Sequence, residues 1–184
     1  MYISEAILGR KSVRAYMDKP VSNNDLEKIV EAGRWAPNAG PFQISVVRNA
    51  GLRKKINNST HKAMLESGIE FAQKRASLPG YQPLYGAPVL ILLSAPVDLP
   101  NGPFNAALAA ENMILAATGL GLGSCFLLSP TRVLDGRHDP ELVTEAGIPD
   151  GYKLQCALIV GHPAAENKFA LGERKLKGSV NYVD

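Results

Sequence analysis

The segment Arg10-Lys11-Ser12-Val13-Arg14 places three cations and a hydroxyl within five residues. In an extended chain successive side chains alternate, so Arg10, Ser12 and Arg14 project to one side. Two guanidinium groups and a hydroxyl on one side suit a phosphate, because the guanidinium forks bind its oxygens in pairs and the hydroxyl adds a donor. The alternative is a solvated basic turn after a short helix. Taken alone, the residues favour that alternative, because short basic motifs recur by chance.

The C-terminal tail carries a second group of cations, Lys168, Arg174, Lys175 and Lys177. By itself this is an ordinary basic terminus. Together with the first segment it could converge on a single anion.

A glycine run at Gly119, Gly121 and Gly123 superficially resembles a dinucleotide-binding fingerprint. That fingerprint needs a glycine-rich turn that follows a strand and opens a helix, whereas here a helical pattern precedes the run. Ser124 also replaces the third glycine. The run therefore predicts a helix end and a tight entry into a strand.

The side chains that carry most enzyme chemistry are scattered. No two of His61, His138 and His162 have metal-ligand spacing on a helix, and no serine lies in a nucleophile-elbow pattern. Cys125 lies in an apolar run and is expected to be a small core residue. We therefore predict no metal site and no catalytic side chain, so that an enzyme built on this chain would depend on a cofactor.

Apolar periodicity predicts the elements that must position these residues. The predicted helices cover 3–8, a segment after Val21, one or two within 51–78, 104–120 and 140–147, and the predicted strands cover 44–47, 88–95, 122–128 and 154–160. Ser22, with Asp25 three residues later, is expected to cap the second helix. The helix over 104–120 is apolar on nearly every side, which predicts burial all round, in the core or in a dimer interface.

Composition restricts the class of protein. The chain has 184 residues, 46% of them hydrophobic, and a net charge of +3, which predicts one domain over 1–184 and no nucleic-acid partner. Two cysteines cannot form a disulfide framework, and no signal peptide is recognisable, so a cytoplasmic protein is expected. The uncharged stretch 112–131 is long enough for a membrane span, but its glycines and Pro130 favour a buried helix followed by a strand.

Four blocks, read in order, carry a family resemblance: GRKSVRAYMDKPVSNNDLEKIVEAGRWAPNAGPFQ at 9–43, GAPVLILL at 86–93, NAALAAENMILAATGLGLGSCFLLSP at 105–130 and YKLQCALIVGHP at 152–163. With them the chain resembles the nitroreductase family of FMN-dependent oxidoreductases. Residues 50–85 resemble the family least. The resemblance implies an α+β fold with a central mixed sheet, helices on both sides, and an intertwined homodimer that holds two FMN molecules at its interface.

The resemblance also implies which residues contact FMN. Those matching the segment that holds the FMN phosphate and ribityl chain are Arg10, Lys11, Ser12 and Arg14, and those matching the tail cations on the same phosphate are Arg174 and Lys175. Those matching the loop that reaches the flavin from the partner subunit are Pro37, Asn38 and Ala39, followed by Gln43. Those matching the turn whose backbone N–H groups face flavin N5 are Leu128 and Ser129.

The chain departs from the family pattern on the substrate side of the flavin. The family loop usually reads Pro-Ser-Ala-x-Asn-x-Gln-Pro-Trp, whereas this chain has Asn38 for the serine and Pro41 for the asparagine. Phe126 and Ser129 replace a tryptophan and a glycine near the N5 turn. These changes leave FMN binding in place and leave the substrate open.

The implied function is transfer of hydride from NADH or NADPH, through flavin N5, to a nitroaromatic, a quinone or an activated alkene. One alternative is an FMN-binding protein without turnover, which stores the flavin or senses redox state. A third possibility is an anion-binding domain without flavin.

Overall fold

In the part of the chain that the structure describes, four antiparallel strands form one sheet in the order β1-β2-β4-β3. The computed structural model describes residues 2–166, 169 and 176–183. The strands are β1 (Gln43–Val47), β2 (Val89–Pro96), β3 (Gly123–Leu127) and β4 (Tyr152–Gly161). The helices are α1 (Ile3–Gly9), α2 (Asn23–Arg34), α3 (Ala50–Leu65), α4 (Glu70–Ala76), α5 (Gly102–Gly119) and α6 (Pro140–Glu145), with a short 3₁₀ helix η1 (Ser129–Arg132).

The predicted α+β class is confirmed. β2 and most of β4 are buried along their length, as expected of apolar runs covered on both faces. The strands pair antiparallel, and within the described residues parallel pairing occurs at one isolated bridge, between Ser12 and Ser124. The sheet is therefore mixed only where the N-terminal segment meets β3.

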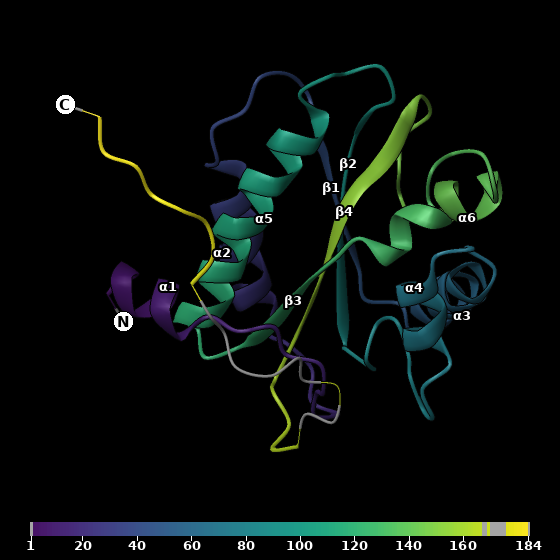
Figure 1. Ribbon diagram of the computed structural model, residues 1–184, viewed down its shortest axis with the longest axis horizontal. Helices are drawn as coiled ribbons and strands as arrows, with labels where there is room; N and C mark the ends of the chain where they lie inside the picture. Colours follow the sequence, from purple (N-terminus) through teal and green to yellow (C-terminus); the bar gives the residue numbers. More distant parts are fainter. Residues whose placement is uncertain (1, 167–168, 170–175, 184) are drawn as a thin grey trace.

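Helices cover both faces of the sheet (Figure 1). On one face α2 and α5 pack together, and Ile29 and Met113 join Leu158 of β4 in one apolar cluster. On the other face Ile56 of α3 and Leu134 pack against alternate residues of the same strands. β2 and β4 thus each contribute to two cores, which explains the absence of polar alternation in their sequences.

Capping side chains fix two of the helix starts. The Ser22 hydroxyl accepts the backbone N–H of Asp25 at 3.1 Å, as predicted. Asp139 accepts the backbone N–H of Leu142 at 2.9 Å and so begins α6.

The single chain buries only part of the apolar helix α5, so the predicted burial all round, in the core or in a dimer interface, stays a prediction for the rest of its surface. The α5 face with Ala106, Ala110 and Met113 is fully buried, but Phe104 is 67% and Leu108 is 47% exposed. The reason is that the sheet, α1 and α2 cover only part of the α5 circumference. An exposed apolar strip of this kind is typical of an interaction surface.

The uncharged stretch 112–131 divides into the end of α5, the strand β3 and the start of η1. Gly121, with φ of +73°, makes the turn between helix and strand. None of the described helices combines the length and apolar character that a membrane crossing requires.

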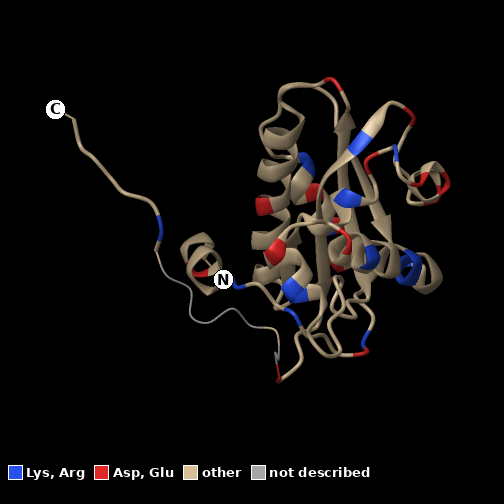
Figure 2. Cartoon of the chain, turned by 45° about the vertical axis from the view of Figure 1, so that its right-hand side comes forward, with Lys and Arg blue, Asp and Glu red and all other residues tan. Residues whose placement is uncertain are grey.

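Neither basic nor acidic residues are confined to one part of the chain. In Figure 2 basic and acidic residues are interspersed along the described body of the chain. This distribution agrees with the small net charge of +3.

Gly161 lets three segments meet at the end of β4. A Cβ atom at this position would lie 2.6 Å from Pro88 Cδ and 2.8 Å from Tyr16 Cδ1, closer than packed atoms approach. We expect Gly161→Ala to lower the free energy of unfolding by about 1–3 kcal/mol through overpacking. Gly119→Ala is the control, because no atom lies within 4 Å of its Cβ position, and it should be neutral or stabilising by up to about 1 kcal/mol. Urea unfolding would measure both, and equal stabilities of the two variants would contradict the assignment.

The buried Cys156 makes stability depend on pH. Burial raises the pKa of its thiol to about 12, whereas the pKa of a thiol in the unfolded chain is about 8.5. Above that pH the unfolded chain binds fewer protons than the folded one, so the free energy of unfolding should fall by up to about 1.4 kcal/mol per pH unit. Urea unfolding under reductant at about pH 7.5 and about pH 9.5 would show this fall, and Cys156→Ala should make it shallower. An identical fall in the variant would exclude Cys156 as its source.

Candidate active site

The N-terminal basic segment lies along the outer edge of β3. The Val13 N–H donates to the Ser124 carbonyl at 2.9 Å, and the Met17 N–H donates to the His162 carbonyl at 2.9 Å. Gly123 permits this approach, because a Cβ atom there would lie 2.9 Å from the Val13 side chain. The Ala164 N–H also donates to the Ala15 carbonyl at 3.0 Å, so three backbone hydrogen bonds and one close contact fix the segment against β3 and the chain that follows β4.

The side chains of this segment alternate as the extended conformation predicts. Arg10, Ser12 and Arg14 are partly buried, whereas Lys11 is exposed and Val13 is packed against the sheet. The structure thus separates Lys11 from the other three polar side chains. The binding of the FMN phosphate and ribityl chain by these residues stays a prediction.

The thiol of Cys125 lies within electrostatic reach of several of these polar side chains. Burial raises the pKa of this thiol, while Arg14, the Ser12 hydroxyl, Arg75 and Arg10 act in the opposite direction. The net effect is a protonated, buried thiol, which fits the predicted core role and gives no activated nucleophile. Its surroundings are electropositive on the side of the basic segment.

Backbone donors face the same edge of β3. Because the Ser124 carbonyl points to Val13, the alternation of a strand directs the N–H groups of Phe126 and Leu128 to this outer edge as well. β3 is the last strand of the sheet, and an edge strand offers such donors to a ligand. Leu128 and Ser129 follow directly, where the chain turns into η1.

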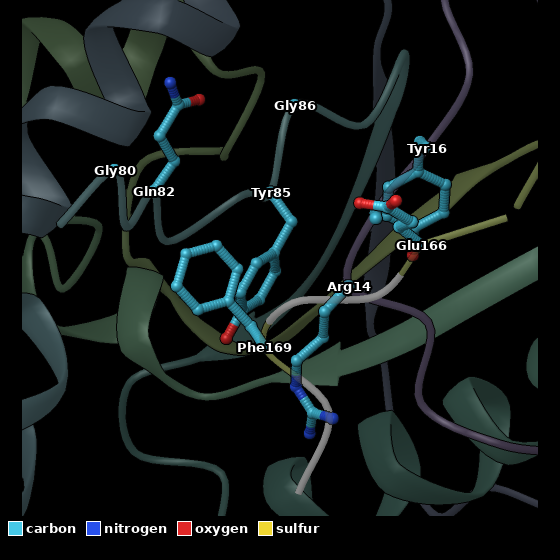
Figure 3. A pocket seen from close by; sticks show the side chains of 9 residues that line it. Arg14, Tyr16, Gly80, Gln82, Tyr85, Gly86, Glu166 and Phe169 are labelled. Carbon is cyan, nitrogen blue, oxygen red and sulfur yellow. The ribbon is translucent and has the colours of Figure 1, made fainter. Parts of the chain in front are cut away.

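Two cavities open beside this edge, and each has a volume typical of a small-molecule site. The larger, of about 590 Å³, runs from Arg14 past β3 and η1 to α3 and α4. The smaller, of about 410 Å³, is lined by Arg14, Tyr16, Tyr85 and Glu166, among others (Figure 3). Arg14 and Tyr85 line both cavities. Among the described residues, the lining of the larger cavity has three arginines and no carboxylate.

Tyr85, which lines both cavities, and the residues that hold it were missed by the sequence analysis. Arg75 of α4 donates from Nε and Nη2 to the Tyr85 hydroxyl at 3.2 and 2.9 Å, and from Nη2 to the Phe169 carbonyl at 3.2 Å. Tyr85 and Phe169 lie side by side in Figure 3, with ring centroids 5.8 Å apart. The proline- and glycine-rich loop with two tyrosines at 79–86 was the available signal, but nothing in it points to Arg75.

Tyr85 also has a strained backbone. Its φ of +50° lies in the left-handed region, which costs a non-glycine residue free energy and is most often found at functional sites. The hydrogen bonds from Arg75 hold the side chain in this position.

The loop with Pro37, Asn38 and Ala39 lies at the opposite end of the sheet. Asn105, buried in α5, accepts the Ala39 N–H at 2.9 Å and donates to the Gly40 carbonyl at 3.4 Å. This loop leads into Gln43, at the start of β1.

The strand pairing gives the distance between this loop and the basic segment. Gln43 pairs with Ser94 of β2, whereas Ser124 pairs with Val160, which pairs with Val89. Five residues of β2 separate the two levels, about 17 Å along the strand.

The structure therefore divides the predicted site residues into groups. Those brought to one edge of the sheet are Arg10, Ser12, Arg14, Leu128 and Ser129. Those placed far from that edge in the same chain are Pro37, Asn38, Ala39 and Gln43. Arg174 and Lys175 lie outside the described residues. No group of three or more potential metal ligands occurs in the part of the chain that the structure describes.

The chain matches a known protein family, several relatives and several solved structures. Residues 7–162 match the family model described as the nitroreductase family. A relative from Archaeoglobus fulgidus, whose name includes NAD(P)H nitroreductase, is 30% identical over 171 residues, which cover 89% of this chain and 86% of the relative. The FMN reductase (NADPH) of Bacillus subtilis is 29% identical over 168 residues, 87% of this chain and 65% of that protein. The crystal structure of a nitroreductase with bound FMN from Bacteroides fragilis superposes with a TM-score of 0.83 at 29% identity, over 100% of both chains.

Proposed function

The chain belongs to the nitroreductase family of FMN-dependent NAD(P)H oxidoreductases, and on this premise we propose that it passes hydride from NADH or NADPH to a nitroaromatic, a quinone or an activated alkene. One observation on this chain supports the proposal. Arg14 of its basic segment and the outer edge of β3 line one cavity, whose described lining residues include three arginines and no carboxylate.

The residues present fit FMN. The cofactor has a charged phosphate at one end and a planar ring whose edge accepts hydrogen bonds. The partly buried Arg10, Ser12 and Arg14 supply cationic and hydroxyl donors in one place, which suits the phosphate. The outward N–H groups at the end of β3 supply neutral donors further along.

Each group of residues then has a role. Arg10, Ser12 and Arg14 would hold the phosphate and ribityl chain, and the backbone of Leu128 and Ser129 would orient the ring. When bound, FMN supplies the two-electron chemistry, taking hydride from NAD(P)H and giving it to the acceptor. The protein positions the reactants and excludes water, and the protonated Cys125 contributes no nucleophile. For a nitro acceptor, one NAD(P)H and one proton yield the nitroso product and water.

A second copy of the chain would complete the site. The loop from Pro37 to Gln43 is too far from the basic segment to serve the same cofactor within one chain. Exposed apolar side chains at Tyr2, Phe104 and Leu108 offer a surface for association. We therefore propose a homodimer in which each chain lends this loop to the other.

An absorption spectrum of the purified protein tests the function. We expect a yellow protein that bleaches anaerobically with NADH or NADPH and regains its colour with a nitroaromatic. A yellow protein that neither nicotinamide bleaches would instead support an FMN store or a redox sensor. A colourless protein that gains nothing from added FMN would overturn the proposal.

Arg14 and Lys11 form a matched pair for the cofactor site. Loss of one charged hydrogen-bonding group should weaken FMN binding to the Arg14→Ala protein by about 1.5–3 kcal/mol, or roughly 10- to 150-fold in Kd. Lys11→Ala removes the same charge from an exposed position, where screening makes the effect smaller. Fluorescence titration of FMN into the apoproteins measures both. Equal Kd values for the two variants would remove Arg14 from the phosphate site.

A further inference from the structure

The larger cavity has an apolar end that the basic segment does not reach. Met64, Ala72 and Tyr81 form a small apolar cluster there, separate from the two clusters that cover the sheet. Phe71 of α4 lines the same cavity and is 69% exposed. A wall with two aromatic rings and a thioether suits a flat aromatic molecule.

Met64 of α3, Phe71 and Ala72 of α4, and Tyr81 in the loop after α4 form this wall. Arg75 holds the neighbouring Tyr85 through hydrogen bonds to its hydroxyl and to the Phe169 carbonyl. The shape of this end of the cavity therefore depends on contacts between α4, this loop and Phe169.

The three arginines of the cavity differ in what they contact. Arg14 belongs to the basic segment, and Arg75 directs donors to Tyr85 and Phe169. Arg132 of η1 is partly buried and lines the cavity, and its side chain has no hydrogen bond or ion pair with any residue that the structure describes. Its guanidinium donors are therefore available to a ligand in the cavity, and a carboxylate there would satisfy two of them at once.

From these observations we propose that the acceptor is an aromatic anion, with its ring against the wall formed by Phe71 and Tyr81 and its negative group on Arg132. The inference rests on the proposed function and specifies its substrate class. For a nitroaromatic carboxylate, the nitro group takes two electrons as hydride from NAD(P)H together with one proton, one N–O bond breaks, and the oxygen leaves as water. The carboxylate is unchanged and serves only for recognition.

Steady-state kinetics with two acceptors of similar size tests the proposal. The probes are 4-nitrobenzoate, which is anionic, and 4-nitrobenzyl alcohol, which is neutral. We expect kcat/KM to favour the anion by about tenfold or more, the size of one charged hydrogen bond. Arg132→Gln should lower this ratio by about the same factor, mainly through KM for the anion, and Arg132→Lys should restore part of it.

Arg137→Gln is the control for net charge, because Arg137 is exposed and lies outside the cavity lining. It should leave the ratio unchanged. A wild-type ratio near one, or an equal loss for both acceptors in Arg132→Gln, would overturn the inference while the flavin spectrum and the reduction of the neutral acceptor still support the proposed function. A protein that reduces neither probe, and no quinone or activated alkene, would instead contradict the proposed function.

Discussion

The pairing of the N-terminal segment with the edge of β3 is the contact on which the site depends. Ser12 bridges to Ser124 and the Val13 N–H donates to its carbonyl, so the described part of the N-terminal segment covers only the first part of this edge. Among the described residues, the backbone N–H groups of Phe126 and Leu128 have no hydrogen-bond acceptor, and both residues line the cavity. The same pairing fixes the alternation that directs Arg10, Ser12 and Arg14 to one side. Glycines at the ends of β3 and β4 let the segment come this close, so side chains on separate elements form one electropositive cavity.

Features that depend on neighbours in sequence could be predicted. The buried strands β2 and β4 were evident as continuous apolar runs, and Ser22 with Asp25 marked the start of α2. The side shared by Arg10, Ser12 and Arg14 followed from the alternation of an extended chain alone. In each case the physical cause acts over a few residues, so the sequence contains it locally. The identity of the ligand required the family resemblance, because a basic segment alone fits many anions.

Features that depend on tertiary pairing could not be predicted. Arg75 bonds Tyr85 ten residues away and Phe169 ninety-four residues away, and no local pattern joins these positions. Asn105 reaches Ala39 across sixty-six residues. The apolar helix α5 shows a related limit, since periodicity reports a hydrophobic surface but does not distinguish a core contact from a contact with a second chain. Only the arrangement of α1, α2 and the sheet around α5 reveals that Phe104 and Leu108 are left outside.

The division of the site between two ends of the sheet has a thermodynamic consequence for the proposed dimer. The sheet is a stiff spacer, so neither the basic segment nor the loop held by Asn105 can move to join the other within one chain. A cofactor that contacts the basic segment of one copy and the loop of another binds the dimer more tightly than the monomer. By linkage, the same cofactor would then stabilise the dimer by an amount that grows with the logarithm of its free concentration above Kd. In the proposed dimer, cofactor retention and assembly would therefore be one coupled equilibrium, because β1 and β3 hold the loop and the basic segment apart in each chain.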